Sequence, residues 1–208
     1  MKATTTNSAE VKPKAGNLDL RKVRFVVGQR GDSTLIVHNF SEKSKREMAD
    51  KQQGLTKAKK RDPKDPIGEY NGARYLNADG QDCFPASSVK NALVAASRYS
   101  DDKMTFLRGA MFVCGSLLPI EHTPPGGGTD PVMREDPVTV GMSKDLRYRP
   151  EYHDWKLTFD VEHNANVITA ERIKQYVELA GFSIGIGEWR PERDGDRGRW
   201  EIVSMTEL

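Results

Sequence analysis

The stretch between residues 155 and 181 constrains the fold most, because it joins a well-marked strand to a well-marked helix. Residues 155–162 alternate apolar and polar side chains with period two, which predicts a half-buried β-strand. Thr169 is suited to cap a following helix and Gly181 to end it. The apolar face of this helix consists of Ile173, Tyr176, Val177 and Ala180. An amphipathic helix directly after such a strand has to share a core with other elements of the same kind.

The first half of the chain has a comparable order of elements. Apolar runs at residues 20–27 and 34–37 predict two strands, and residues 73–76 predict a short third strand before a turn at 77–80. The mostly apolar run at 106–120 predicts a buried strand.

A helix is expected directly after Pro85, capped by Ser87 or Ser88. Its apolar positions are Val89, Leu93 and Ala96. We expect this face to pack with Ile173, Val177 and Ala180 on one side of the sheet, because each helix has a single apolar stripe.

This order predicts an α+β fold, a ferredoxin-like (RRM-like) βαββαβ sandwich with both helices on one face of an antiparallel sheet. We expect residues 18–208 to form one domain and the Thr-, Lys- and Ala-rich residues 1–17 to form a disordered tail. Two insertions interrupt the domain, a basic helical one at about residues 41–70 and a Pro- and Gly-rich loop at about residues 121–147. A small hairpin is expected in that loop, around residues 132–133 and 138–140.

Charge is unevenly distributed along the 208 residues. Residues 1–70 carry 16 Lys and Arg against 9 Asp and Glu, whereas the whole chain has a formal net charge of +2. A basic front and an acidic back favour head-to-tail self-association or a polyanion on one face. The two isolated cysteines, the lack of an apolar run of membrane length and the lack of a secretion signal predict a cytoplasmic protein with no membrane contact.

The first insertion is almost purely polar. Ser41 is a possible N-cap, and the helix is expected to continue to about Lys60, before Pro63 and Pro66 stop it. A helix with so little apolar surface is either a solvated surface helix or a phosphate-binding one. The cations that would contact phosphate are Lys43, Lys45, Arg46, Lys57, Lys59 and Lys60.

The segment between Gly181 and a last strand near Arg199 is rich in glycine and arginine. Glycine permits positive φ and the close approach of another chain, and arginine suits phosphate. The candidate nucleic-acid contacts here are Gly185, Gly187, Trp189, Arg190, Arg197 and Arg199. The alternative is a hairpin whose glycines serve its turns and whose arginines are solvated.

The order of these motifs resembles that of a known family. The helix start Phe84-Pro85-Ala86-Ser87-Ser88-Val89-Lys90-Asn91, together with the loop that runs from Gly185-Ile186-Gly187 to Arg197-Gly198-Arg199, is similar to motifs of the RAMP superfamily of CRISPR-associated RNA-binding proteins. The resemblance spans roughly residues 20–204 and is strongest to the backbone subunits that polymerise along guide RNA. Ala86 and Asn91 stand where that family has glycines, and residues 188–194 are inserted in the loop, which indicates a remote relative such as one encoded by a phage.

The resemblance implies sequence-tolerant binding of single-stranded RNA or DNA by a homo-oligomeric, non-catalytic subunit. Arg147 and Arg149 would add phosphate contacts, and Trp189, Phe40 or Tyr148 would stack on bases. One alternative is a metal-independent endoribonuclease, with His38, Asp130 or Asp136 in acid–base chemistry. Another is a viral structural subunit that does not bind nucleic acid. We expect no metal and no cofactor, since His122, His153 and His163 are scattered.

Overall fold

The computed structural model describes residues 17–39, 42–55, 63–140 and 143–208. The predicted tail therefore lies outside the described residues, apart from Asn17. So do Phe40, Ser41, Lys57, Lys59 and Lys60.

The main sheet is antiparallel, with the strand order β10-β1-β9-β6-β4-β3 and with β5 paired beside β6 on β9. Its strands are β1 (Leu20–Gln29), β3 (Tyr75–Leu76), β4 (Asp82–Pro85), β5 (Met111–Val113), β6 (Leu117–Glu121), β9 (Lys156–Asn164) and β10 (Trp200–Glu207). Four neighbouring positions at one end of this sheet, from the edge strand β10 through β1 and β9 to β5 and β6, have the order of a ferredoxin-like sheet. The predicted α+β class is therefore confirmed.

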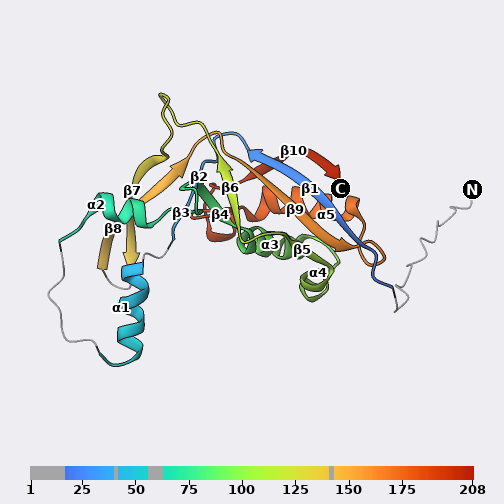
Figure 1. Cartoon of the computed structure of the whole chain (residues 1–208), viewed down its shortest axis with the longest axis horizontal. Coiled ribbons are helices and arrows are strands. Elements are labelled where there is room, and N and C mark those ends of the chain that lie inside the picture. The colour runs from blue at the N-terminus through green and yellow to red at the C-terminus, as the bar shows by residue number, and fades with distance from the viewer. Residues whose placement is uncertain (1–16, 40–41, 56–62, 141–142) are drawn as a thin grey trace, which may run out of the picture.

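Two long strands and two helices build the core. Strand β1 pairs with β9 along almost its whole length, and the rings of Phe25 and Phe159 stack with centroids 5.8 Å apart. Helices α3 (Ala86–Ala95) and α5 (Ala170–Leu179) contact each other on the same side of the sheet (Figure 1). The six residues predicted to pack together are all buried in this one core: Val89, Leu93, Ala96, Ile173, Val177 and Ala180. That prediction is confirmed, and each large apolar side chain buried here contributes roughly 1.5–3 kcal/mol.

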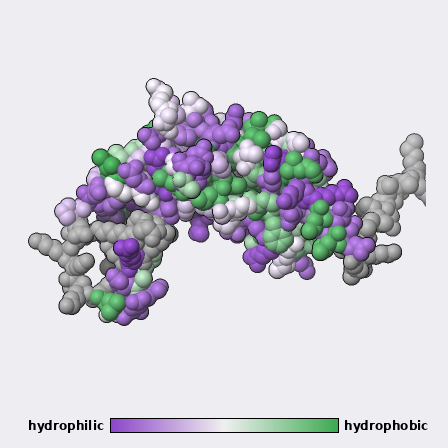
Figure 2. Space-filling view, viewed as in Figure 1, coloured by the Kyte–Doolittle hydropathy of each residue, from purple (hydrophilic) through white to green (hydrophobic). Residues whose placement is uncertain are grey.

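A smaller sheet and two helices extend from one end of this body (Figure 1). The sheet has the order β2-β8-β7, made of β2 (Leu35–Ile36), β7 (Val132–Val140) and β8 (Ser143–Tyr152). Helix α2 (Pro66–Gly72) packs on β8, while α1 (Glu42–Gln52) projects away from the body. Hydrophilic residues cover most of the face seen in Figure 2, and hydrophobic ones show only as small separate patches.

The buried strand predicted at residues 106–120 is wrong. The run forms helix α4 (Met104–Ala110), then β5, then β6. Leu107 and Ala110 are buried at helical spacing while Phe106 is exposed, and Gly115 with φ +86° separates the two strands. An apolar run that contains both a helical period and a strand period cannot be assigned to one element by hydrophobicity alone.

The long loop predicted after Glu121 is also wrong in extent. Only residues 122–131 are irregular, and the chain then forms the long β7–β8 hairpin, of which the expected small hairpin is a part. Pro137 lies within β7, the edge strand of its sheet, which is where proline is tolerated in sheets.

Three helix ends differ from expectation. Helix α3 begins directly after β4, so Pro85 and not Ser87 or Ser88 is its N-cap. Helix α1 ends at Gln52, not Lys60, before a turn in which Gly54 has φ +70°. Helix α5 does begin after the Thr169 cap, which accepts a hydrogen bond from the Arg172 amide, but it continues past Gly181 as a π turn. Strand β4 and helix α2 were not predicted.

Gly181 is required by packing and not by helix termination. A Cβ at this position would lie 2.4 Å from the carbonyl oxygen of Trp200 on β10. We predict that Gly181→Val lowers the free energy of unfolding by about 1–3 kcal/mol, as overpacking does. The measurement is urea denaturation followed by circular dichroism.

The matched control is Gly109→Ala in α4, where an added Cβ meets no heavy atom of the described residues within 4 Å outside its own helix. This control should be neutral or stabilise by up to about 1 kcal/mol, since alanine is the better helix former. Equal destabilisation by both changes would contradict this account of Gly181.

Candidate nucleic-acid interface

The glycine-rich loop is fixed on strand β2. Its amides at Glu188 and Gly198 donate to the carbonyl oxygens of Ile36 and Thr34 at 2.8 Å each. Within the loop, the amide of Ile186 donates to the carbonyl oxygen of Gly198 at 3.0 Å. The segment is therefore a folded loop with a defined backbone, and it joins the end of α5 to the start of β10.

The glycines of this loop are needed for its own packing. A Cβ on Gly187 would lie 2.3 Å from the carbonyl oxygen of Ile36, and one on Gly198 would lie 1.8 Å from that of Ile186. Gly185 and Gly187 also have φ of +70° and +75°. The space beside these glycines is filled by the protein's own atoms, so their presence does not by itself indicate a ligand.

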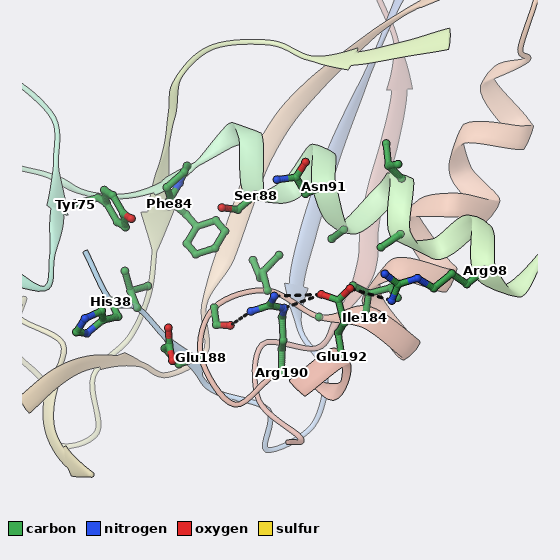
Figure 3. Close-up of a pocket in the computed structure, with 18 of the residues that line it drawn as sticks. His38, Tyr75, Phe84, Ser88, Asn91, Arg98, Ile184, Glu188, Arg190 and Glu192 are labelled. Atoms are coloured by element: carbon green, nitrogen blue, oxygen red, sulfur yellow. Dashed lines mark hydrogen bonds and ion pairs between the residues drawn. The ribbon is translucent and has the colours of Figure 1, made fainter. Parts of the chain in front are cut away.

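The same loop forms one wall of a groove of about 390 Å³, and α3 forms the other wall (Figure 3). The groove brings together the two motifs that the sequence analysis singled out, the start of α3 and the Gly185-Ile186-Gly187 segment. Its polar and charged lining residues are His38, Ser88, Asn91, Arg98, Arg108, Glu188, Arg190 and Glu192, and its rings are Tyr75 and Phe84.

The groove has an excess of positive charge. Three arginines face two carboxylates, and His38 adds no charge in its neutral form. Glu192 lies between two of the arginines, with Oε1 3.0 Å from Nη1 of Arg98 and Oε2 3.1 Å from Nη2 of Arg190. Arg108 is exposed, and its guanidinium has no partner among the described residues. The first amides of α3 have no side-chain cap, which leaves the positive end of the helix dipole beside the groove.

His38 lies at one end of the groove, close to Glu188 (Figure 3). Burial lowers the pKa of this imidazole below its ordinary value of 6.5, and the neighbouring Arg149 guanidinium lowers it further. His38 is therefore neutral at pH 7.

Arg149 is not a surface contact. Its side chain is 4% exposed and lies 3.5 Å from Asp136 and 3.7 Å from Glu188. Burial lowers the pKa of Arg149 below its usual value, and the neighbouring carboxylates of Glu188 and Asp136 offset part of this decrease. Arg134 bonds Asp136 and Glu151 beside it, so Asp136, a candidate for acid–base chemistry, is held in a buried ionic network.

The remaining predicted contacts are scattered around the groove. Trp189 is exposed and has φ +54°, and it lies with Arg197 in a separate shallow depression. Arg147 and Tyr148 line a neighbouring cavity of about 260 Å³, which His38 also borders. Arg199 is half-buried beside Ser33, Asp130 pairs with Arg74, and Arg46 is exposed on α1. Lys43 and Lys45 belong to α1, but their side chains lie outside the described residues.

Two predicted arginines also support the loop itself. Nη1 of Arg190 donates to the carbonyl oxygen of Gly187 at 2.9 Å, and Nη1 of Arg197 donates to that of Asp32 at 2.9 Å. Replacing either would disturb the loop as well as any ligand. Arg108 is therefore a cleaner probe of binding than Arg190 or Arg197.

The sequence did not predict four of the residues that line the groove: Asn91, Arg98, Arg108 and Glu192. A signal was present for the α3 side, since Ser88, Asn91, Ala95 and Arg98 recur at helical spacing as a small and polar stripe. The loop side had no such signal, because the position of Glu192 depends on how the loop folds.

The open face of the main sheet differs from an aromatic binding platform. On β1 and β9 its central side chains are ion pairs, with Arg24 bidentate to Asp160 and Lys22 3.6 Å from Glu162. Within the described residues, no three His, Cys, Asp or Glu side chains come together as metal ligands. No helix in the described part of the chain is long and apolar enough to cross a membrane.

Comparison with known proteins defines the fold. No protein-family model matches the sequence, and no curated protein is significantly similar to it. A solved chain does match in structure, from a cryo-EM structure of the Type III-B Cmr-beta complex bound to cognate target RNA, with a TM-score of 0.56 and 8% sequence identity. The match covers 91% of this chain and 61% of the other chain. The likeness extends to the fold alone, and at that level it agrees with the resemblance to the RAMP superfamily.

The pKa of His38 can be tested directly. We predict that the His38 ring, assigned by comparison with His38→Gln, titrates below pH 6.5 in an NMR series. With the folded-state pKa lowered, the unfolded state binds more protons at His38 than the folded state does when the pH falls below about 6.5. The free energy of unfolding therefore decreases as the pH falls through this range, and His38 has no such effect at higher pH. A midpoint at or above 6.5 would show that His38 is not desolvated.

Proposed function

We propose that the protein binds single-stranded nucleic acid, RNA in preference to DNA, in the groove between α3 and the glycine-rich loop. The observation that carries this proposal is the groove itself, with its three arginines, the start of α3, which no side chain caps, and the half-buried ring of Tyr75. Cations and helix amides suit phosphates, and an aromatic ring such as that of Tyr75 can stack on an unpaired base of any identity. Trp189 and the cations of α1 would add contacts outside the groove.

The assembly is part of the same proposal. The Cmr-beta chain with the matching fold belongs to a complex bound to target RNA. We infer that this protein likewise acts as a subunit along a nucleic acid and that it does so as a homo-oligomer. Identical subunits along one strand each meet a different sequence, so their binding has to tolerate any sequence. Light scattering of the protein with and without oligouridine would measure that assembly.

A charge reversal tests the groove. We predict that Arg108→Glu weakens binding to fluorescein-labelled oligouridine about tenfold or more and lowers the slope of log K against log salt by about 0.7, the value for one lost single-strand phosphate contact. Fluorescence anisotropy at several salt concentrations is the measurement.

The matched control is Lys156→Glu, on the open face of the sheet. It changes the net charge equally, and its effect should stay small if the groove is the binding site. An equal loss in both variants would place binding elsewhere, and no binding by the native protein would favour a structural subunit.

A second function rests on His38, which is neutral at pH 7 and lies at the end of the groove. An imidazole in this state is suited to accept a proton from a ribose 2′-hydroxyl. Metal-independent endoribonuclease activity would appear as cleavage of labelled RNA in the presence of chelator, lost in His38→Gln. Intact RNA with the native protein would exclude this role.

A further inference from the structure

One carboxylate holds together arginines from the two walls of the groove. Arg98 follows α3 on one wall, and Arg190 belongs to the loop on the other, and both side chains meet Glu192 between them (Figure 3). Three of the guanidinium nitrogens lie 3.0 to 3.2 Å from its two oxygens. This is an anion site that the protein itself occupies.

The same geometry suits a phosphodiester. Guanidinium groups bind carboxylate and phosphate oxygens through the same charge-assisted hydrogen bonds. Arg190 is also held by its hydrogen bond to the carbonyl oxygen of Gly187, so it stays directed at the site when the carboxylate leaves. Arg98 is fixed at its backbone by the end of α3.

The internal anion is placed where it can be exchanged. Side-chain exposures are 52% for Arg98, 27% for Arg190 and 22% for Glu192. Water screens ion pairs of this exposure, so the pairing is weak. Glu192 lies on a single 3₁₀ turn, Pro191–Arg193, at the surface of the loop.

We propose that Arg98 and Arg190 form a phosphodiester-binding site and that Glu192 is an internal competitor that occupies it when no nucleic acid is bound. This proposal rests on the proposed function. It adds Arg98 to the residues that bind nucleic acid, and it explains how Glu192 limits the affinity for nucleic acid. A strand bearing many phosphates displaces Glu192, whereas a single weak anion does not. When the nucleic acid dissociates, the Glu192 carboxylate returns to the two arginines, and this competition favours release of the strand.

The test compares matched variants with fluorescein-labelled oligouridine in fluorescence anisotropy. Glu192→Gln should bind about 3- to 10-fold more tightly than the native protein, with a slope of log K against log salt steeper by about 0.7, because the phosphate contact of Arg98 no longer replaces an internal ion pair. Glu178→Gln on α5, an exposed position away from the groove with the same change of charge, should change the affinity less than about twofold.

Two further variants separate competition from a structural role. Arg98→Gln should weaken binding by about 3- to 10-fold, as expected for loss of one charge-assisted contact. In the double variant, the gain from Glu192→Gln should shrink, because the carboxylate acts through the arginines. Circular dichroism of each variant checks that it is folded.

The outcomes are distinct. If native protein binds but folded Glu192→Gln binds no more tightly, or if its gain is unchanged in the Arg98→Gln background, Glu192 is not a competitor and the groove can still be the binding site. If neither the native protein nor any variant binds oligouridine, the proposed function fails together with this inference.

Discussion

The close packing of the glycine-rich loop on strand β2 determines the shape of the candidate site. Gly187 fits against the carbonyl oxygen of Ile36. The amide of Glu188 donates to this same oxygen, and the amide of Gly198 donates to the carbonyl oxygen of Thr34, just before β2. A side chain at Gly187 would force the loop away from the sheet. Because the loop is held there, it lies opposite α3, and the groove between them has fixed walls.

An ionic network that is buried in the hairpin of the smaller sheet reaches this loop through the exposed side chain of Glu188. Arg149 on β8 lies between Asp136 on β7 and Glu188 in the loop, and Glu151 accepts a hydrogen bond of 2.6 Å from Thr34 beside β2. Removing one member of such a network leaves another charge buried and unpaired, which is far more costly than losing a surface ion pair. The network also places a positive charge near His38, so the hairpin influences the chemistry at the end of the groove.

The sequence was sufficient for the parts of the fold that depend on local pattern. The alternation at residues 155–162 and the cap at Thr169 predicted β9 and α5, and the apolar stripes of the two helices predicted their shared core. It was insufficient where tertiary contacts decide the local structure. The run at 106–120 contains a helical and a strand period, and Pro137 lies in a strand whose edge position only the folded sheet reveals. Gly181 serves a contact with Trp200 that no local pattern encodes.

The candidate site was predictable in the same partial way. The motif at the start of α3 and the glycine-rich loop were both singled out, and the structure brings them together around one groove. Arg149 was assigned to the surface because a charge in a strand gives no sign of which neighbours will bury it. Glu192 was not assigned at all, since a carboxylate among arginines reads as solvated charge until its partners are placed.

Photo-crosslinking to oligonucleotides that contain 4-thiouridine, followed by mass spectrometry of the peptides, tests the central claim most directly. If the groove binds single-stranded RNA, crosslinks should fall in residues 84–98 of the α3 wall and in residues 184–192 of the loop. Crosslinks confined to β1, β9 and β10, on the open face of the sheet, would contradict the account.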